Sequence, residues 1–368
     1  MLFLAGDIGG TKALLQLIEI QPETSTTLHR GQQRYLCQEF DSLESIIQTF
    51  LSSLNLSSNI IESACFGLPG PVDGRVVQLT NLPWEVDADQ IEQLCSIRNV
   101  SFINDFHAAA LGVQALTSEQ VLTLYDPSLY EKEPFPVAGH YLVIGAGTGL
   151  GVSPVFFDGT EVNPIASEGG HFDFAPISET QQLLLNWLWQ EYEHVSYERV
   201  LSGPGLETLY RFFQLYDCPV TYSADDSQNF KKNRIKSTQN DQLGLFIAEP
   251  RLDALNVQPL SAAEIFGAAE RNEPIAVKAM TEFVTIYGAF VGAAALLWSA
   301  PQGVYLAGGI AAKIINWMNK PYFHKAYLEK GRMSKIVASR PVYLINDDLL
   351  GLRGAMQHNL RFSKSNGA

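Results

Sequence analysis

Apolar and polar positions along the chain predict an alternation of strands and helices. Two apolar runs, 2–8 and 12–20, are separated by a Gly-Gly turn and predict a β-hairpin. Over 42–54 the apolar residues recur at helical spacing, and 63–72 has the pattern of a buried strand that ends in a Gly/Pro turn. This alternation is typical of an α/β fold.

A second strand and glycine turn occur in the middle of the chain. Residues 100–105 predict a short strand whose polar end leads directly into a helical pattern over 106–116, and ligands of α/β folds bind at such strand ends. The segment 140–157 repeats the strand, turn and strand of the amino terminus, which suggests two halves that hold one ligand. Further elements are expected at 179–193, 205–215, 261–271 and 274–299 (helices), 303–310 (strand) and 343–360 (strand, acidic turn and helix).

Two segments need a separate interpretation. No charged residue occurs over 283–312, which is longer than the roughly 20 residues that span a bilayer. The run is broken at 300–303 and is rich in Gly and Ala, so it predicts a buried helix followed by a buried strand. The polar stretch from about 219 to 259 is predicted to be a surface excursion or mobile loop without chemistry.

Composition and charge exclude several classes of protein. The 368 residues, 46% of them hydrophobic, can bury a sizeable core in two or three domains. A net charge of −14 disfavours nucleic acid and anionic membranes as partners. The short apolar start lacks a basic flank, so export is not expected. The cysteines (Cys37, Cys65, Cys95 and Cys218) lack CxxC or metal-type spacing and predict core residues of a cytoplasmic protein.

Three glycine turns are candidate ligand sites. "GDIGGTK" at 6–12 lets several N–H groups converge on an anion, although a plain hairpin explains it equally well. "GAGTGLG" at 145–151 is weak alone, but two such turns suit a polyphosphate held at two places. "AGGI" at 307–310 is a common packing motif; beside the other two, it offers a flat surface for a purine or ribose.

The polar strand end "IND" has two interpretations. An aspartate at a helix start is most often a cap. In phosphoryl transfer, however, a carboxylate at Asp105 accepts the proton of the attacking hydroxyl and holds that oxygen in line. Neither interpretation is excluded by the strand end alone.

"SEGGHFDF" at 167–174 places Glu168 and His171 around two glycines. Zinc requires three or more protein ligands, and the helical HExxH spacing is missing, so a metal site is disfavoured. A carboxylate and an imidazole on a loop can instead bind neighbouring sugar hydroxyls. Glu198 in "YERVLSGPG" and Asn81 in "LTNLPW" have simpler explanations, as a solvated or capping glutamate and as a turn residue.

Eight motifs in register give the chain a family resemblance. "GDIGGT", "GLPGPV", "TNLPW", "INDF", "GAGTGLG", "EGGHFDFAP", "ERVLSGPG" and "AGGI" occur in this order from Gly6 to about Gly354. With them the chain resembles the bacterial-type glucokinases, zinc-free group, of the actin-like, hexokinase and sugar-kinase ATPase superfamily.

The resemblance implies a two-domain actin-like (ribonuclease H-like) α/β fold with an interdomain cleft. Residues 1–106 plus 348–368 would form a small domain, and 107–347 a large one. The implied activity is ATP-dependent phosphorylation of D-glucose to glucose 6-phosphate with Mg²⁺, in a cytoplasmic protein that is expected to be a homodimer. Closure around the sugar would exclude water and bring the hydroxyl and the γ-phosphate into line.

The resemblance also implies roles residue by residue. Asp105 matches the general base, and Asp7 matches the carboxylate that orients magnesium through water. The positions that hold glucose hydroxyls are Asn104, Glu168, His171 and Glu198, with Asn81 as a weaker match. The phosphate loops are Gly9, Gly10 and Thr11, then Gly147, Thr148 and Gly149, and the adenosine loop is Gly308 and Gly309.

Departures from the family pattern leave other functions possible for the chain. Lys12 makes "GGTK" similar to repressor-type sugar kinases, but the zinc-binding cysteine cluster of those proteins has no counterpart here. A kinase for another hexose, such as mannose or an N-acetylhexosamine, remains an alternative. So does a non-catalytic sugar sensor on the same scaffold. An actin-like ATPase that needs no sugar is disfavoured by Glu168, His171 and Glu198.

Overall fold

The structure is a computed structural model. It describes residues 1–366 except 22–23, 25, 57–59, 80, 128–137 and 223–258, and for residues 362–366 it describes the backbone only. Most of the predicted polar excursion at 219–259 therefore lies outside the described residues.

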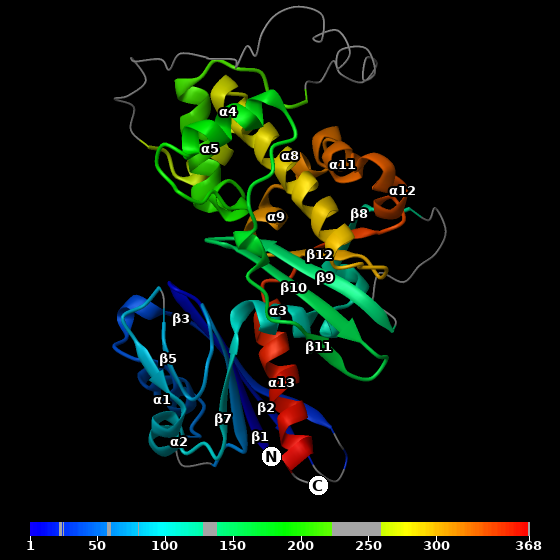
Figure 1. Cartoon of the computed structure of the whole chain (residues 1–368). Helices are drawn as coiled ribbons and strands as arrows, with labels where there is room; N and C mark the ends of the chain where they lie inside the picture. The colour runs from blue at the N-terminus through cyan, green and yellow to red at the C-terminus, as the bar shows by residue number, and fades with distance from the viewer. Residues whose placement is uncertain are drawn as a thin grey trace, which may run out of the picture.

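The first sheet has the strand order β3-β2-β1-β4-β7 (Figure 1). β1 pairs with β2 and β2 with β3 in antiparallel fashion, whereas β1, β4 and β7 run parallel. This arrangement confirms the predicted amino-terminal hairpin. The strands are β1 (Leu2–Ile8), β2 (Lys12–Ile20), β3 (Thr27–Leu36), β4 (Ser63–Leu68) and β7 (Val100–Asn104), and a separate ribbon pairs β5 (Val76–Gln78) with β6 (Glu85–Asp87).

The second sheet repeats the plan of the first. Its order is β11-β10-β9-β12-β13-β8, with an antiparallel meander of three strands followed by two strands parallel to β9. β8 adds an antiparallel edge next to β13. The strands are β8 (Val121–Tyr125), β9 (Gly139–Ala146), β10 (Leu150–Phe157), β11 (Val162–Pro164), β12 (Val304–Ala307) and β13 (Val342–Ile345). The predicted similarity between the two glycine hairpins thus extends to the whole sheets.

Helices cover the outer face of each sheet. α1 (Leu43–Ser53) begins after Ser42, whose hydroxyl accepts from the Ser45 N–H, and with α2 (Ala88–Cys95) it packs on the first sheet. On the outer side of the second sheet, α9 (Gly309–Lys313) contacts the strands, and the other helices gather around α8. They are α4 (Glu179–Leu188), α5 (Gly203–Leu215), α7 (Ala262–Glu270), α8 (Pro274–Leu297), α10 (Ile315–Met318), α11 (Pro321–Leu328) and α12 (Ser334–Val337). α4 ends earlier than predicted, because residues 189–194 are mostly exposed and bury no apolar face.

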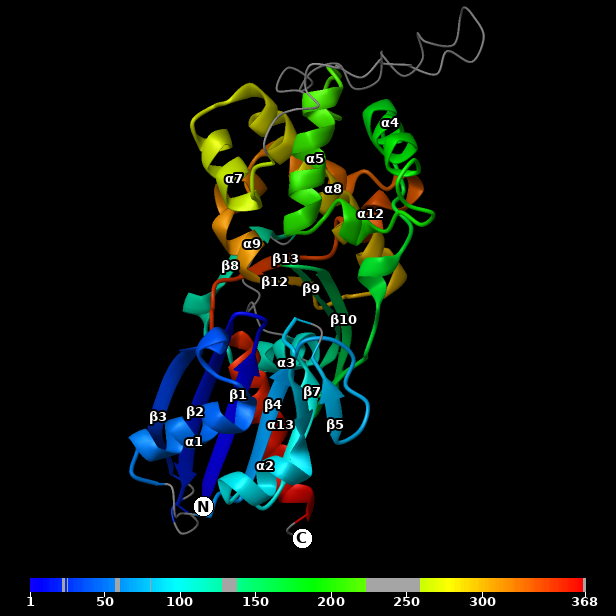
Figure 2. The ribbon, with the colours of Figure 1, turned by 90° about the vertical axis from the view of Figure 1, so that its left-hand side faces the viewer.

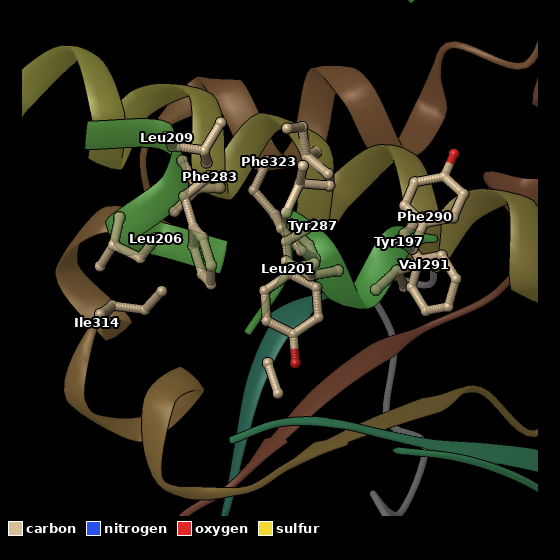
Figure 3. Packing of buried hydrophobic residues seen from close by; sticks show 14 of the residues in the cluster. Tyr197, Leu201, Leu206, Leu209, Phe283, Tyr287, Phe290, Val291, Ile314 and Phe323 are labelled. Atoms are coloured by element: carbon tan, nitrogen blue, oxygen red, sulfur yellow. The ribbon is translucent and has the colours of Figure 1, made fainter. Parts of the chain in front are cut away.

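α8 is the central helix of the larger core. Among the described residues it alone is long and apolar enough to cross a membrane, but 83% of its apolar window is buried inside the protein. Figure 3 shows its residues Phe283, Tyr287 and Phe290 packed against side chains of α5, α11 and the segment around Tyr197. The uncharged run over 283–312 is therefore a core helix followed by the buried strand β12, as predicted.

A third layer of helices lies between the two sheets. α3 (Asp105–Gly112) and α13 (Leu350–Asn366) run side by side there in both views (Figures 1 and 2). α3 is shorter than the predicted 106–116, because its last turn tightens into a 3-10 helix at Val113–Ala115. α13 also packs on β1 and β4. The division into 1–106 plus 348–368 and 107–347 stays a prediction with which this packing is compatible.

Gly354 allows α3 and α13 to cross closely. A Cβ added at Gly354 would lie 1.6 Å from the Ala108 carbonyl oxygen, and one added at Gly112 would lie 2.2 Å from the Leu350 carbonyl oxygen. Real Cβ atoms do not approach backbone so closely, so any side chain here would push the helices apart. The spacing of these helices also sets the position of Asp105, the first residue of α3.

Gly354→Ala is expected to destabilise the protein by about 1–3 kcal/mol, because overpacking must displace backbone. The free energy of unfolding in urea measures this change. Gly267→Ala in α7 is the matched control, since its Cβ would meet only the end of the Arg271 side chain at 3.5 Å. The control should be neutral or slightly stabilising, as alanine favours helix. Equal behaviour of the two variants would contradict the close crossing.

Candidate active site

Asp7 and Asp105 lie at one edge of the first sheet. Asp7 is near the end of β1, and Asp105 follows β7 directly; β4 runs between these parallel strands. Gly67 of β4 fills the gap, since a Cβ there would lie 3.7 Å from both the Asp105 Cα and the Gly6 carbonyl oxygen. The carboxyl ends of parallel strands meet at this edge, where α/β folds bind ligands.

The pKa values of both carboxyl groups are raised, mainly by burial. Burial raises the pKa of Asp7 to about 6, the negative charge of Asp105 adds to the rise, and Arg34 opposes it. Burial also raises the pKa of Asp105 above its ordinary value, opposed first by the N–H of Phe106, which donates to Asp105 Oδ1 at 2.7 Å. Two partly desolvated carboxylates form an oxygen donor set of the kind that magnesium prefers.

The sequence pattern did not reveal Arg34. It lies on β3 opposite Leu14, and Leu14 lies opposite Asp7, so the three residues form one row across the sheet. The strand register is the signal that could have found it, because residues paired across neighbouring strands share a face. Gly351 of α13 lies close to the Asp7 carboxyl group, since a Cβ there would be 2.8 Å from Asp7 Oδ2.

Asn104, rather than Asp105, is the N-cap of α3. Its Oδ1 accepts from the N–H groups of Phe106 and His107 at 2.9 and 3.0 Å, and its Nδ2 donates to the Gly70 carbonyl at 2.9 Å. The capping interpretation of "IND" therefore belongs to Asn104. The Asp105 carboxyl group is nevertheless engaged at the helix start, because its Oδ1 accepts from the Phe106 N–H at 2.7 Å and the Asn104 side chain also hydrogen-bonds it. Its remaining lone pairs can accept from a ligand.

Backbone hydrogen bonds stabilise the first glycine turn, residues 9–12. The Gly9 N–H donates to the Lys12 carbonyl at 2.8 Å, and the Cys37 N–H donates to the Thr11 carbonyl at 3.0 Å. Asn81, predicted as a sugar residue, lies against this turn, because a Cβ on Gly10 would be 2.8 Å from the Asn81 Cβ. The turn presents Gly9, Gly10 and Thr11 at the surface of the site.

The second glycine turn and the "AGGI" turn are neighbours. β9 pairs with β12, with Ala307 opposite Gly145, so both turns leave the same edge of the second sheet. The Gly147 N–H donates to the Gly149 carbonyl at 2.8 Å, and Thr148 is exposed at the tip. Gly308 has φ +88°, a conformation that favours glycine. Added Cβ atoms at Gly147 and Gly309 would meet nothing within 4 Å, so these backbones face open space.

The sugar loop packs directly on the second glycine hairpin. Residues Gly169–His171 form a single 3-10 turn, with the side chains of Glu168 and His171 exposed. A Cβ on Gly170 would lie 2.0 Å from the Leu150 carbonyl oxygen. Gly170 is thus required by close contact with the Leu150 backbone, whereas a Cβ on Gly169 would meet the side chains of Ser167 and Val152 at 3.0 Å.

Phe106 connects Asp105 to the same hairpin. Cβ atoms added to Gly145 and Gly151 would lie 2.6 and 2.4 Å from the Phe106 ring. Glu198 reaches the hairpin by another route, since its Oε2 accepts from the Leu150 N–H at 2.8 Å. The residues predicted at the sugar site, Asp105, Glu168 and Glu198, are therefore gathered around one β-hairpin of the second sheet. They do not contact one another directly within the described part of the chain.

Metal-type clusters give no competing site. Within the described residues there is no group of three or more His, Cys, Asp and Glu side chains placed to hold a metal ion. Cys37, Cys65, Cys95 and Cys218 are all buried and unbridged, as predicted for core residues.

The fold is the actin-like ATPase fold of sugar kinases, and comparisons with known proteins specify the family. A family model described as Glucokinase matches residues 4–361. Curated glucokinases of Nostoc sp. and Synechocystis sp. are 36% and 35% identical to the chain, over 96% of it and 97% and 96% of their own lengths. The chain therefore belongs to the glucokinase family, as its motifs predicted.

Solved structures support the same fold. The crystal structure of a glucokinase from an Antarctic psychrotroph is 25% identical, with a TM-score of 0.73 over 98% of this chain and 99% of that one. A ROK family glucokinase from Streptomyces griseus in complex with glucose and AMPPNP is 19% identical, with a TM-score of 0.56 over 98% and 100% of the two chains. The second likeness concerns the fold alone.

Proposed function

We infer that this chain phosphorylates D-glucose at its 6-hydroxyl with ATP, giving glucose 6-phosphate and ADP. The observation that carries this conclusion is the match to the glucokinase family over residues 4–361. The related ROK family glucokinase from Streptomyces griseus is in complex with glucose and AMPPNP, an ATP analogue, which supports glucose and ATP as substrates here.

In the proposed mechanism Asp105 is the general base. Its carboxylate lies at a strand end, keeps acceptor capacity beyond the bond from the Phe106 N–H, and would accept the proton of the attacking hydroxyl while holding that oxygen in line. Glu168, His171 and Glu198, with Asn104 and Asn81, would hold the remaining hydroxyls. A carboxylate can accept from two neighbouring hydroxyls at once.

The glycine turns would hold the nucleotide. Gly9, Gly10 and Thr11 would bind one phosphate group and Gly147, Thr148 and Gly149 another, through backbone N–H groups. Gly308 and Gly309 would support the adenosine. Asp7 would orient magnesium through water, and the bound ion would neutralise charge on the phosphoryl oxygens. The homodimer, the cytoplasmic location and the absence of nucleic acid and membrane partners stay proposals.

A coupled assay for ADP release with a panel of hexoses tests the function. We expect release that depends on glucose, with less from mannose or N-acetylhexosamines. ADP release without any sugar would indicate an actin-like ATPase, and sugar binding without ADP release would indicate a sensor. Either result would overturn the proposal, and a preference for another hexose would change the substrate. Family membership favours glucose over these alternatives.

A further inference from the structure

Leu150 is the residue at which the sugar segments meet the second phosphate turn. Its N–H donates to Glu198 Oε2 at 2.8 Å. Its carbonyl oxygen lies against Gly170, where a Cβ would be only 2.0 Å away. Leu150 is also the first residue of β10, directly after the Gly147–Gly149 turn. Both polar groups of one peptide residue therefore contact segments predicted to bind sugar.

The Glu198 carboxylate lies on the turn itself. A Cβ on Gly149 would be 2.6 Å from Glu198 Oε2, so only glycine leaves room for the carboxylate. Oε2 is occupied by the Leu150 N–H, whereas Oε1 has no hydrogen-bond partner among the described residues and can accept from a ligand hydroxyl. One carboxylate can thus contact the sugar and the phosphate turn at the same time.

The chain after Glu198 contacts the other end of the turn. The Gly203 N–H donates to the Gly147 carbonyl at 2.8 Å. Ser202 connects the two contacts, because its hydroxyl donates to the Glu198 carbonyl at 2.8 Å and accepts from the Gly205 N–H at 3.0 Å. The segment 198–205 therefore contacts the turn at both ends.

The backbone at Glu198 is anchored to the core and to the loop 168–172, which contains Glu168 and His171. The neighbouring Tyr197 is buried in the core of Figure 3, with its ring centroid 4.7 Å from that of Phe290 in α8. The Tyr197 N–H donates to the Phe172 carbonyl at 2.8 Å, next to His171. The backbone at 197–199 is therefore fixed, and the freedom that remains lies in the Glu198 side chain.

We propose that Glu198 couples the two substrate sites: a sugar hydroxyl on one carboxylate oxygen orders the other oxygen on Leu150, and this holds the Gly147–Gly149 turn in its nucleotide-binding position. The proposal rests on the proposed function, because it requires glucose to contact Glu198. Glucose then strengthens nucleotide binding, and by linkage the nucleotide strengthens glucose binding by the same factor. Glu198 is thereby a positioning residue for the phosphates as well as a sugar ligand.

Isothermal titration calorimetry with ADP tests the coupling, since ADP and glucose do not react. ADP is titrated into the full-length protein in magnesium buffer, with and without saturating glucose. For the wild type we expect glucose to lower the Kd of ADP on the order of 10-fold. In Glu198→Ala the ratio of the two Kd values should fall to near unity. In Glu168→Ala, the control, a sugar contact is lost but Leu150 is untouched, so the ratio should persist once glucose saturates.

Gly149→Ala separates the two contacts of Glu198. The new Cβ displaces the carboxylate from Leu150 but leaves it in the protein to bind sugar, so glucose binding should persist while the ratio falls. This variant decides the question if Glu198→Ala binds too little glucose to saturate. A wild-type ratio in Gly149→Ala, or a ratio of one in the wild type, overturns the coupling. If the Glu198–Leu150 contact only supports the turn, whether or not glucose is bound, Gly149→Ala would weaken ADP binding equally with and without glucose. This result would also overturn the proposed coupling.

The proposed function can fail separately. If the wild type shows no glucose binding and no glucose-dependent ADP release, the function itself is wrong. If turnover with glucose is normal but the Kd of ADP does not depend on glucose, only the proposal of coupling through Glu198 is wrong.

Discussion

Asp105→Asn is expected to lower kcat by about 10²–10⁴-fold, the contribution typical of a positioned general base. Asparagine has nearly the same size and can still accept from the Phe106 N–H, so the start of α3 should remain intact. Its amide cannot take a proton from the attacking hydroxyl. Steady-state ADP release at saturating glucose and ATP measures the loss of kcat.

The binding of substrates separates a lost base from a lost fold. Calorimetric affinity for glucose should stay close to that of the wild type, because Asp105 acts mainly on the proton. Asp73→Asn, at an exposed loop position, is the matched control and should retain full activity. If Asp105→Asn kept near-normal turnover, Asp105 would not be the base.

Glu168→Gln is expected to raise KM for glucose roughly 10–150-fold, with a smaller change in kcat. The range corresponds to the loss of one charge-assisted hydrogen bond, about 1.5–3 kcal/mol. The fold should tolerate the change, because Glu168 is exposed and the 3-10 turn after it depends on the backbones of Gly169 and Gly170. Initial rates over a range of glucose concentrations give KM and kcat separately.

A matched substitution shows whether the effect is local. Glu193→Gln removes an exposed carboxylate from the same lobe and should leave KM for glucose unchanged. An unchanged KM in Glu168→Gln would remove Glu168 from the sugar site. A fall in kcat with an unchanged KM would instead assign it an interaction made only in the transition state.

Much of the local structure could be predicted from the sequence. The hairpin 2–20, the helix after Ser42 and the core helix α8 follow from apolar periodicity, glycine turns and capping residues, all of which act over a few positions. The ends of two predicted helices differ from those in the structure. α4 stops at Leu188 where its apolar face ends, and α3 tightens after Gly112 where α13 crosses it. The end of α4 is set by local sequence, whereas the end of α3 depends on α13, a helix more than 200 residues away in the chain.

The candidate site was predicted only in part. Its residues were recognisable by type and by motif order, but Arg34 and Phe106 were missed. Arg34 lies in no motif and reaches the site through strand register, whereas Phe106 ends the motif "INDF" but its role depends on the glycines that accept its ring. Burial likewise raises the pKa of Asp7, because distant segments, including α13, remove it from water.

By itself the sequence determined which segments form strands, helices and glycine turns, and which side chains are available for sugar and phosphate chemistry. Those properties depend on neighbouring residues, so they can be read along the chain. The tertiary structure decided that Asp7 and Asp105 share one edge, that Asn104 rather than Asp105 caps α3, and that the sugar segments meet the phosphate turn at Leu150. The first and last of these arrangements join residues far apart in the chain, and only the packing of two sheets around α3 and α13 brings such residues together. The cap is a local contact, for which the strand end "IND" offers both Asn104 and Asp105.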